Sequence, residues 1–531
     1  RSTTVTGVQT CALPIFLLGI ILLIAVFLRF YKLGEKSFIA DEFLGVNASY
    51  GYLQTGEWRR WDFNLEQPMQ DKPFAKTWFD WDIFKGGPET YTRAWIYHWQ
   101  IAQALKFLPD AQEWSYRVVS ALWGVLSILI IYFLTWKFTG KKWIGLIAAI
   151  LLTLSPDAIV FSRKARMYAM FMPIFFLLSY WIFKFLESKE QYQNKFLVNF
   201  RKKIGLDLSY LPGVIVLGLL AMHLHALTAN IIILALIYIL VMAIGEWKKN
   251  GKWENRYSAY LLTVLLGAVV SRIFFKNVAV WGVYFDSERH FSYLSKILAD
   301  YNSAILAIGL FLAGGWWLIK QNRKGGWFVL ISFVTILMLA VFFWNRNAGE
   351  QYIFFLKPFQ IILLATGIYA IASYLRNNLQ SGKYKIFYIA IAILILVLNN
   401  WSCYFSADGP YKQNSQSDSP NYRKIFSYIV KEKKPEEVLV TRNFRNFYWQ
   451  GNKAKVYSLG GERAEETDKK IDLTTIKKII ADNPAGGWIV LSENDKSFIS
   501  KETEEYLRKN LDLVSNLFLR GPVTVYHWGR L

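Results

Sequence analysis

An adjacent pair of acids, Asp41 and Glu42, follows the first strongly apolar segment of the chain. The surrounding sequence reads FLRFYKLGEKSFIADEFLGVNASYGYL, in which basic and aromatic residues separate the apolar run from the acids. A carboxylate at the edge of a bilayer is costly to place and is usually kept for chemistry. One interpretation is therefore a catalytic base held at the membrane surface. The alternative is a solvated loop acid without a chemical role.

Basic residues and two histidines occur in the segments that flank later apolar runs. Arginine and lysine bind and neutralise phosphate, so several of them together would suit an anionic headgroup. The alternative is electrostatic anchoring of the chain to lipid headgroups. His223 and His225 form an H-x-H pattern, whose rings lie on different faces of a helix and suit one metal ion poorly. For these two histidines, the alternatives are a contact with the substrate and a hydrogen-bonded structural role. The candidate phosphate-binding residues are Arg93, Arg163, Arg166 and Lys357.

The composition indicates the class of protein that positions these residues. Of 531 residues, 54% are hydrophobic and 17% aromatic, which excludes an ordinary soluble domain for most of the chain. A net charge of +22 would suggest nucleic acid binding in a soluble protein, but here the basic residues gather in short loops between apolar runs. We therefore expect membrane lipids, and no nucleic acid, as partners. The two cysteines, Cys11 and Cys403, support neither a disulfide framework nor a metal site.

Apolar segments near the length of roughly 20 residues that crosses a bilayer recur along the chain. The first residues, RSTTVTGVQTCALPI at 1–15, look like translated adapter sequence, so we expect this segment to be non-native. The remaining sequence predicts a polytopic α-helical membrane protein with about eleven transmembrane helices. These lie near 16–31, 115–136, 143–160, 169–186, 207–224, 226–245, 257–275, 298–319, 327–344, 353–374 and 386–402.

The distribution of positive charge predicts the orientation of these helices. Alternate short loops, such as WKFTGKK, EWKKNGKWENR, KQNRKGG and RNNLQSGKYK, are strongly basic, whereas the loops between them carry far fewer positive charges. Because basic loops stay on the cytoplasmic side, we expect a cytoplasmic N-terminus. The long loop 32–114 and the C-terminal region are then extracytoplasmic, and the usage of Lys, Ile and Asn favours a bacterial cytoplasmic membrane.

Two regions do not read as membrane-spanning. The loop 32–114 contains DEFLGVNASYGYLQ and TRAWIYHWQIAQALKFL, which predict helices lying in the membrane interface or, alternatively, a surface loop packed on the protein itself. A polar linker at 404–420 precedes the region 421–531. There, helical patterns alternate with the β-rich runs EVLVT, AKVYSL, GWIVLSE and VTVYHW, which predicts a small α/β domain. It carries no catalytic or nucleotide-binding motif that we can name.

Short motifs follow one another in a defined order between the apolar segments. They comprise Asp41 and Glu42, Arg93 in YTR, Arg117, Ser120 and Gly124 in YRVVSALWG, Ser155, Pro156, Ser162, Arg163, Arg166 and Tyr168 in LSPDAIVFSRKARMY, and Tyr352 and Pro358 in QYIFFLKPF. Each motif alone is unspecific, but their order and spacing resemble the GT-C membrane glycosyltransferases. The resemblance is to glycosyltransferase family 39, the protein O-mannosyltransferase and aminoarabinose transferase group, and covers residues 16 to 402.

The resemblance implies a GT-C transmembrane catalytic domain over 16–403 and transfer of a sugar from a polyprenyl-phosphate carrier on the extracytoplasmic face. The acceptor hydroxyl would attack the anomeric carbon with inversion as the lipid phosphate leaves. Asp41 would be the general base. Glu42 is a second candidate acid, or it positions Asp41 or the acceptor. The cationic candidates and Tyr168 would bind the phosphate, and Tyr352 joins the two histidines as a candidate substrate contact. No cofactor is certain; a divalent metal ion is possible but not expected, and the polyprenyl-phosphate sugar is the donor substrate.

The chain departs from the family pattern at Lys164, where relatives often carry an acid, and at Gln351, where they often carry arginine. The donor sugar therefore stays open, as does the acceptor, which is a protein, a glycolipid or a cell-wall polymer. The oligosaccharyltransferase motif W-W-D-Y-G is absent from the sequence, which argues against transfer of a whole oligosaccharide. Two alternatives remain: a polyprenyl-lipid flippase or transporter, and a non-catalytic binding or scaffold protein.

Overall fold

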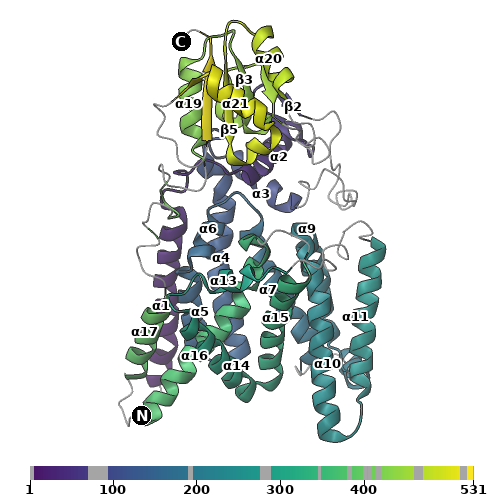
Figure 1. The fold of residues 1–531 in the computed structure, drawn as a ribbon. Helices are drawn as coiled ribbons and strands as arrows, with labels where there is room; N and C mark the ends of the chain where they lie inside the picture. Colours follow the sequence, from purple (N-terminus) through teal and green to yellow (C-terminus); the bar gives the residue numbers. More distant parts are fainter. Residues whose placement is uncertain are drawn as a thin grey trace. The chain divides into compact units, whose positions relative to one another are not determined.

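The structure, a computed structural model, describes most of the chain and groups it in two compact units. The first unit comprises Arg1–Tyr31, Ser120–Arg163 and Met167–Trp401, and the second comprises Lys32–Val119, Lys164–Arg166 and Ser402–Leu531 (Figure 1). The loop 32–114, which we grouped with the transmembrane domain, thus clusters with the C-terminal region. Cys403 and most of the predicted linker lie outside the described residues. Those residues are 5–69, 94–188, 195–274, 289–344, 349–378, 385–398, 404, 409–412, 420–459, 471–514 and 523–529.

Helices make up the first unit within the part of the chain that the structure describes. The long helix α4 (Glu113–Thr139) begins in the second unit and continues into the first. The other elements are α1 (Val5–Phe30), α5 (Lys142–Thr153), α6 (Pro156–Ser162), α7 (Tyr168–Glu187), α8 (Lys195–Ile204), η3 (Leu208–Tyr210), α9 (Leu211–Leu224), η4 (Ala226–Ala229), α10 (Asn230–Asn250), α11 (Asn255–Phe274), α13 (Ser292–Leu298), α14 (Ala304–Gln321), α15 (Arg323–Phe342), η5 (Glu350–Tyr352), η6 (Phe354–Leu356), α16 (Lys357–Asn378) and α17 (Lys385–Val397).

All eleven predicted apolar segments contain helix, but fewer meet the length and composition of a complete span. Among the described residues, seven helices are long and apolar enough to cross a membrane, and nine spans result if two bent helix pairs each count as one. The bent pairs are α5 with α6, at 64°, and the helices over Phe196–Ile204 and Leu208–Leu224, at 109°. The predicted segments 257–275 and 386–402 contain the shorter apolar helices Arg256–Val269 and Tyr388–Val397. The protein is thus a polytopic helical membrane protein.

The bend between α5 and α6 has a local cause. The Ser155 hydroxyl accepts a hydrogen bond from the backbone N–H of Ala158, and Pro156 occupies the first turn of α6. A serine N-cap followed by proline starts a new helix instead of continuing the previous one. This is why the segment predicted as one span over 143–160 consists of two helices.

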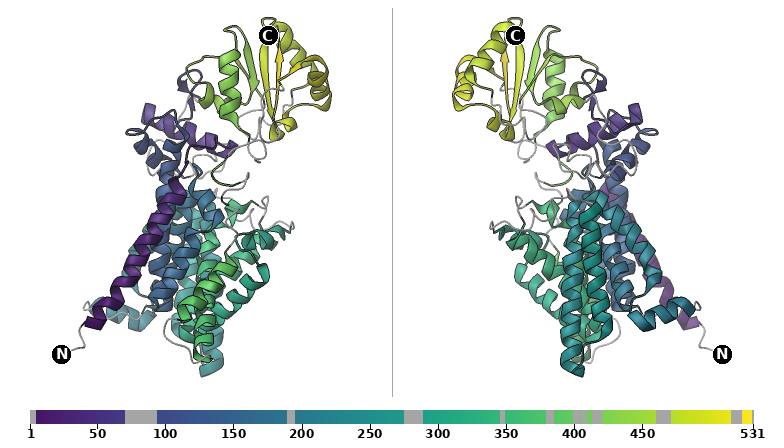
Figure 2. Two further views of the ribbon diagram at one scale, coloured as in Figure 1. Left: turned by 90° about the vertical axis from the view of Figure 1, so that its left-hand side faces the viewer. Right: turned by 90° about the vertical axis from the view of Figure 1, so that its right-hand side faces the viewer.

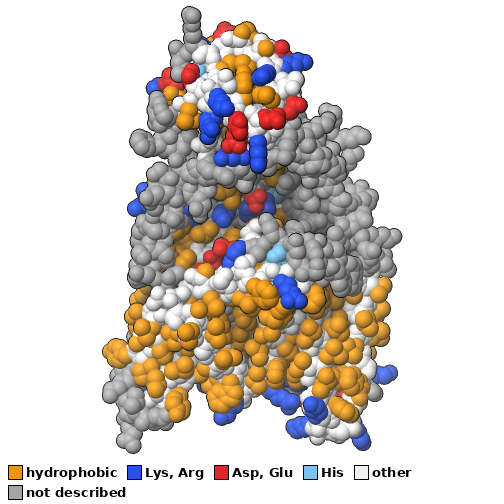
Figure 3. All heavy atoms as spheres, in the orientation of Figure 1, with side chains coloured by type: hydrophobic (Ala, Val, Ile, Leu, Met, Phe, Trp, Pro, Cys, Tyr) orange, Lys and Arg blue, Asp and Glu red, His pale blue; other side chains and the backbone are white. Residues whose placement is uncertain are grey.

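The outer surface of the helical unit is apolar. Figure 3 shows hydrophobic side chains gathered over these helices, with lysine and arginine side chains at their lower end. Fully outward-facing residues include Ile305, which is 86% exposed, and Leu312, which is 70% exposed. Exposed apolar surface of this extent is stable in contact with lipid, where the helices satisfy their own backbone hydrogen bonds.

Two glycines bring α14 and α16 into close contact. A Cβ atom at Gly314 would meet the carbonyl oxygen of Leu363, and one at Gly367 would meet the carbonyl oxygen of Leu310. Small residues at such crossings allow helix backbones to approach closely inside a membrane. The crossing of α14 and α16 therefore depends on the absence of side chains at both positions.

The second unit contains the elements of the first loop. They are α2 (Ala40–Thr55), the antiparallel pair β1 (Trp61–Asp62) and β2 (Gln67–Pro68), and α3 (Trp95–Leu105). The two predicted helical runs correspond to α2 and α3. All residues of α2 from Glu42 to Ser49 are buried, as are six residues of α3. Both runs are thus helical, as predicted, and their buried residues pack on the protein itself.

The C-terminal region of the second unit forms a mixed five-stranded sheet in the order β4-β3-β5-β7-β6. β3 pairs in parallel with β4 and β5, whereas β7 pairs antiparallel with β5 and β6. Figure 2 shows helices packed beside this sheet. The core of the region consists of buried aliphatic residues together with Tyr526 and Trp528. The elements are α19 (Tyr422–Glu432), β3 (Val438–Thr441), η7 (Asn443–Trp449), β4 (Val456–Ser458), α20 (Leu473–Asp482), β5 (Gly487–Ser492), η9 (Glu493–Phe498), α21 (Lys501–Asn510), β6 (Asp512–Leu513) and β7 (Val523–Trp528).

The glycine crossing yields a test of the helical unit. We expect Gly314→Val to lower the free energy of unfolding by about 3 kcal/mol, because its side chain would force α14 away from α16. The matched control is Gly309→Val in the same helix, since a Cβ atom there would meet no atom within 4 Å. Thermal unfolding of the purified protein in detergent measures both. Equal stability of the two variants would contradict this packing.

Candidate active site

Asp41 and Glu42 stand in the first turn of α2, yet their surroundings differ sharply. The side chain of Asp41 is 57% exposed, whereas that of Glu42 is fully buried. Because neighbouring helix positions point in different directions, one acid faces solvent while the other faces the interior of the unit. The pair therefore contains one accessible carboxylate and one structural carboxylate.

The Glu42 carboxylate binds three separate segments of the second unit. Its two oxygens accept hydrogen bonds from Nε and Nη2 of Arg117, each at 2.9 Å. Oε1 also accepts from the N–H of Ala165 at 2.6 Å, and Oε2 accepts from the N–H of Ile39 at 3.0 Å. The last contact caps the N-terminus of α2. Glu42 thereby ties α2 to the first turns of α4 and to the segment Lys164–Arg166.

This set of donors determines the charge state of Glu42. Burial by itself would raise the pKa of Glu42. The charge and hydrogen bonds of Arg117, together with the amides of Ala165 and Ile39, outweigh burial and hold the pKa below its ordinary value of 4.5. Glu42 is consequently ionised and fully hydrogen-bonded at neutral pH.

Arg166 is the cation that the structure brings next to Asp41. Its Nη1 donates to the backbone carbonyl of Asp41 at 3.1 Å, and its Nη2 lies 4.0 Å from Oδ2 of the Asp41 side chain. Because Ala165 is bound to Glu42, the same interaction that fixes α2 also fixes the residue preceding Arg166. An accessible carboxylate and a guanidinium thus lie side by side, an arrangement suited to removing a proton beside an anionic group.

His98 belongs to this neighbourhood, and the sequence analysis missed it. Burial, with a smaller effect of the Arg166 charge, lowers the pKa of His98 to about 3, so that the imidazole is neutral. A Cβ atom at Gly45 would lie 2.8 Å from Cε1 of His98, which shows how closely α2 and α3 pack. The Nδ1 atom of His98 is buried without a hydrogen-bond partner among the described residues. A single histidine within an amphipathic run does not reveal from the sequence that its side chain lies in this part of the fold.

Arg163 has a structural environment in the first unit. Its Nη1 donates to the carbonyl oxygens of Arg29 at 3.0 Å and Tyr31 at 2.6 Å, where α1 ends. Carbonyls at a helix C-terminus lack intrahelical donors, and a buried guanidinium satisfies them. Arg163 therefore holds the end of α1 in place.

Lys357 is neutralised by two acids that the sequence analysis did not single out. Its ammonium lies 3.0 Å from Oδ2 of Asp157 and 2.8 Å from Oδ2 of Asp300. Asp300 also accepts hydrogen bonds from the Ser155 hydroxyl and, at 3.2 Å, from the N–H of Asp157. With its side chain only 4% exposed, Lys357 joins α16 to the start of α6 and to the segment preceding α14.

The remaining candidates of the first unit form a cluster of rings. The ring of His225 lies 5.8 Å from that of Tyr168 and 6.3 Å from that of Tyr352, and it also contacts Phe171. Its Nδ1 accepts a hydrogen bond from the N–H of Leu227 at 3.1 Å and so caps η4. His223 is buried near the end of α9. Three of the candidate residues, Tyr168, His225 and Tyr352, thus lie close together. The His225 ring already makes a structural hydrogen bond.

Arg93 lies outside the described residues. Among the residues that the structure describes, no group of three or more His, Cys, Asp or Glu side chains is arranged to hold a metal ion. Within the second unit, the structure brings Asp41, Glu42 and Arg166 together and adds Arg117 and His98 to them.

The buried ion pair predicts a characteristic response to mutation. We expect Glu42→Gln to lower the free energy of unfolding at neutral pH by about 3 kcal/mol, because it leaves Arg117 charged and buried. The double variant Glu42→Gln with Arg117→Met should recover part of this loss. Thermal unfolding in detergent measures both, and equal destabilisation by the single and double variants would contradict the ion pair.

The same pair predicts a pH dependence. Since the pKa of Glu42 is lowered on folding, its stabilising contribution is complete above its ordinary value of 4.5 and is lost as the pH falls through the folded-state pKa. The unfolding temperature of the wild type should therefore fall more steeply on acidification below this value than that of Glu42→Gln. If the unfolding temperatures of the two proteins fell in parallel with pH, Glu42 would not be the group that causes the loss of stability in acid.

Comparisons with known proteins agree with this architecture. Residues 93–247 match the model of the family described as dolichyl-phosphate-mannose-protein mannosyltransferase. A search of curated proteins returned no match.

Solved structures give similarity over nearly the whole chain. ArnT from Cupriavidus metallidurans in the apo state is 12% identical with a TM-score of 0.57, covering 98% of each chain. The same protein bound to undecaprenyl phosphate is 13% identical with a TM-score of 0.54, covering 96% of this chain and 97% of that one. The oligosaccharyltransferase AglB from Archaeoglobus fulgidus, in complex with an inhibitory peptide and a dolichol-phosphate, is 12% identical with a TM-score of 0.55, covering 90% of this chain and 69% of its own. The chain therefore has the same fold as ArnT and AglB, in line with the predicted GT-C fold.

Proposed function

We propose that the chain transfers a sugar from a polyprenyl-phosphate carrier to an acceptor hydroxyl on the extracytoplasmic face of the membrane. The observation that carries this proposal is the accessible Asp41 carboxylate beside the Arg166 guanidinium, at the start of a helix fixed by a buried ion pair. The similar structures support a lipid-phosphate donor, since ArnT is bound to undecaprenyl phosphate and AglB to a dolichol-phosphate.

In the proposed reaction, Asp41 removes the proton of the acceptor hydroxyl as its oxygen forms a bond to the anomeric carbon. The bond between that carbon and the phosphate oxygen breaks, and the polyprenyl phosphate leaves with the electron pair. Attack opposite to the leaving group inverts the anomeric configuration. Arg166, and Arg93 as a sequence-based proposal, would stabilise the charge that develops on the phosphate.

The other candidates take supporting roles in this proposal. Glu42 has all of its hydrogen bonds within the protein, so we assign it the positioning of Asp41 and Arg166 and not proton transfer. Arg163 and Lys357 are occupied by carbonyl and carboxylate groups, which favours a structural role for both. Tyr168, His225 and Tyr352 stay proposed substrate contacts, and no step requires a metal ion.

The first test removes the proposed base. Asp41→Asn should lower the transfer rate by at least about a hundredfold, because the amide cannot accept the acceptor proton. The matched control is Asp110→Asn, which changes another exposed acid of the same unit that accepts a hydrogen bond only from Tyr50 among the described contacts. Membranes containing each variant would be incubated with radiolabelled polyprenyl-phosphate sugars. Full transfer by Asp41→Asn would exclude it as the base, and absence of transfer in the wild type would favour a transporter or scaffold.

The second test concerns the phosphate contact. Arg166→Ala should lower kcat/KM for the donor by about a hundredfold, since it removes a charge placed where the leaving group develops. Arg166→Lys should recover only part of the loss, because a point charge replaces the planar fork. Arg59→Ala is the control, since Arg59 pairs with Glu57 in the same unit. Equal donor kinetics in Arg166→Ala and the control would contradict the assignment.

A further inference from the structure

The hydroxyl of Tyr448 lies between the first loop and a buried carboxylate. It accepts a hydrogen bond from the backbone N–H of Phe38 at 2.7 Å and donates one to Oε1 of Glu113 at 2.8 Å. Burial, with the charge of Glu113 added to it, holds the pKa of Tyr448 well above its usual range, so the hydroxyl keeps the proton that it donates. Phe38 immediately precedes Ile39, the N-cap of the helix that carries Asp41.

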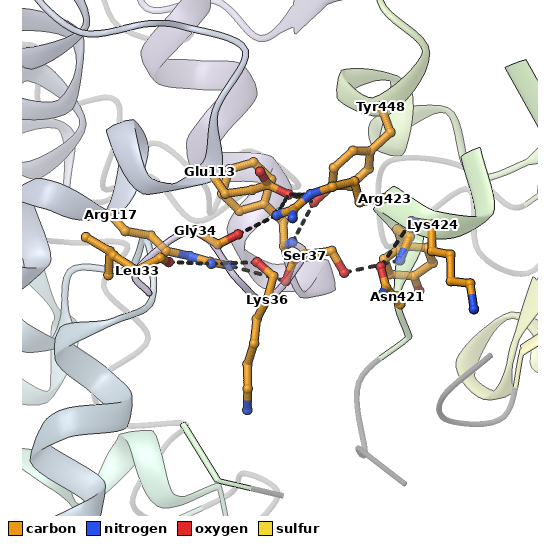
Figure 4. A network of polar contacts seen from close by, with 12 residues as sticks. Leu33, Gly34, Lys36, Ser37, Glu113, Arg117, Asn421, Arg423, Lys424 and Tyr448 are labelled. Atoms are coloured by element: carbon orange, nitrogen blue, oxygen red, sulfur yellow. Dashed lines mark hydrogen bonds and ion pairs between the residues drawn. The ribbon is translucent and has the colours of Figure 1, made fainter. Parts of the chain in front are cut away.

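Glu113 is itself held by the C-terminal region. Its Oε1 accepts from Nε of Arg423 at 2.8 Å, and Nη2 of Arg423 also donates to the carbonyl oxygen of Gly34 at 2.5 Å (Figure 4). A second contact involves Ser37, whose hydroxyl donates to the carbonyl oxygen of Pro420 at 3.0 Å and accepts from the N–H of Tyr422 at 3.1 Å. Residues of the C-terminal region thus bind the segment 33–38 at three places.

The opposite side of this segment is bound by the guanidinium of Arg117. Its Nη1 donates to the carbonyl oxygens of Leu33 at 3.2 Å and Lys36 at 2.7 Å, and its Nη2 donates to that of Ser37 at 3.2 Å. Between the end of α1 and the start of α2, this segment forms turns and bends without helix or strand. Its position therefore depends on side-chain contacts, since no regular backbone ladder holds it.

Aromatic packing accompanies these hydrogen bonds. The ring of Phe38 lies 5.1 Å from that of Phe447 and 5.7 Å from that of Tyr116, and the ring of Phe43 lies 5.7 Å from that of Tyr448. Phenylalanine in place of Tyr448 would keep the ring contact and remove only the hydroxyl. The two contributions can therefore be separated by experiment.

We propose that the C-terminal region acts as a positioning element for the transfer reaction, with Tyr448 as the residue that sets the start of α2 and hence the placement of Asp41. The inference rests on the proposed function, because it takes Asp41 to be the base. In this proposal, the C-terminal region affects the rate of transfer without contacting the substrate. Its effect passes through the backbone of three residues, Phe38 to Ala40, to Asp41. Tyr448 is a positioning residue in this scheme.

The decisive variant is Tyr448→Phe in the full chain purified in detergent. Hydrogen–deuterium exchange of the backbone amides at 38–42 should be about fivefold faster than in the wild type, because one hydrogen bond to the Phe38 amide is lost. The control is Tyr457→Phe, which removes from the same region a hydroxyl that accepts from Asn483. Unchanged exchange at 38–42 in Tyr448→Phe, or an equal change in the control, would overturn the proposal.

A kinetic readout separates positioning from general stability. Tyr448→Phe should lower kcat about fivefold with the donor KM unchanged, since the placement of the base affects the transition state more than donor binding. In an Asp41→Glu background, where the longer side chain has already displaced the carboxylate, the same change should have a much smaller effect. An equal fold-loss in both backgrounds would overturn the positioning role.

The two measurements also distinguish this inference from the proposed function. If the wild type transfers no sugar while exchange at 38–42 responds to Tyr448→Phe, the proposed function fails and the structural link from Tyr448 to α2 stands. If transfer occurs but Tyr448→Phe leaves kcat unchanged, the proposed function stands and the positioning role is excluded.

Discussion

The buried ion pair between Glu42 and Arg117 is the interaction on which the second unit depends. Two charges taken out of water gain little net stability, because the cost of desolvation cancels much of their attraction. Breaking such a pair is nevertheless expensive, since the remaining charge has no water to bind. The consequence of the pair is therefore geometric: any arrangement that separates α2 from the start of α4 leaves an ion unpaired inside the protein.

The same interaction explains how two adjacent acids come to differ. Glu42 is buried and accepts hydrogen bonds from four donors on three residues, whereas Asp41, one position earlier, faces outward. An exposed carboxylate next to a fully hydrogen-bonded one has its backbone held by the buried neighbour, while its own side chain stays accessible. Arg166 gains from the same geometry, because the neighbouring Ala165 amide is bound to Glu42. Accessibility and rigidity, which usually oppose each other in loops, are thereby combined.

Much of the architecture follows from the sequence, because apolar length and alternating hydrophobicity are local properties. The eleven apolar segments all contain helix, and the β-rich runs of the C-terminal region contain β3, β4, β5 and β7. Breaks within spans were harder to recognise, although Ser155 followed by Pro156 is a local signal for a new helix. Asp41 is a candidate base because of its position after the first apolar segment and because of a family resemblance, and this role stays a prediction.

The partners of buried charges could not be predicted, because they are set by tertiary contacts between distant residues. Lys357 at the start of an apolar segment reads as a cation that binds a phosphate or a lipid headgroup, yet its two carboxylate partners lie 200 and 57 residues away in sequence. Arg163 similarly reads as part of a basic cluster, although the chain uses it to satisfy carbonyls at the end of α1. A sequence reveals where a charge is costly but not which group offsets that cost. Asp41 and Arg166 pair with each other at an exposed position of the second unit, and the placement of Asp41 depends on the irregular segment that leads into α2 and on the residues that bind it.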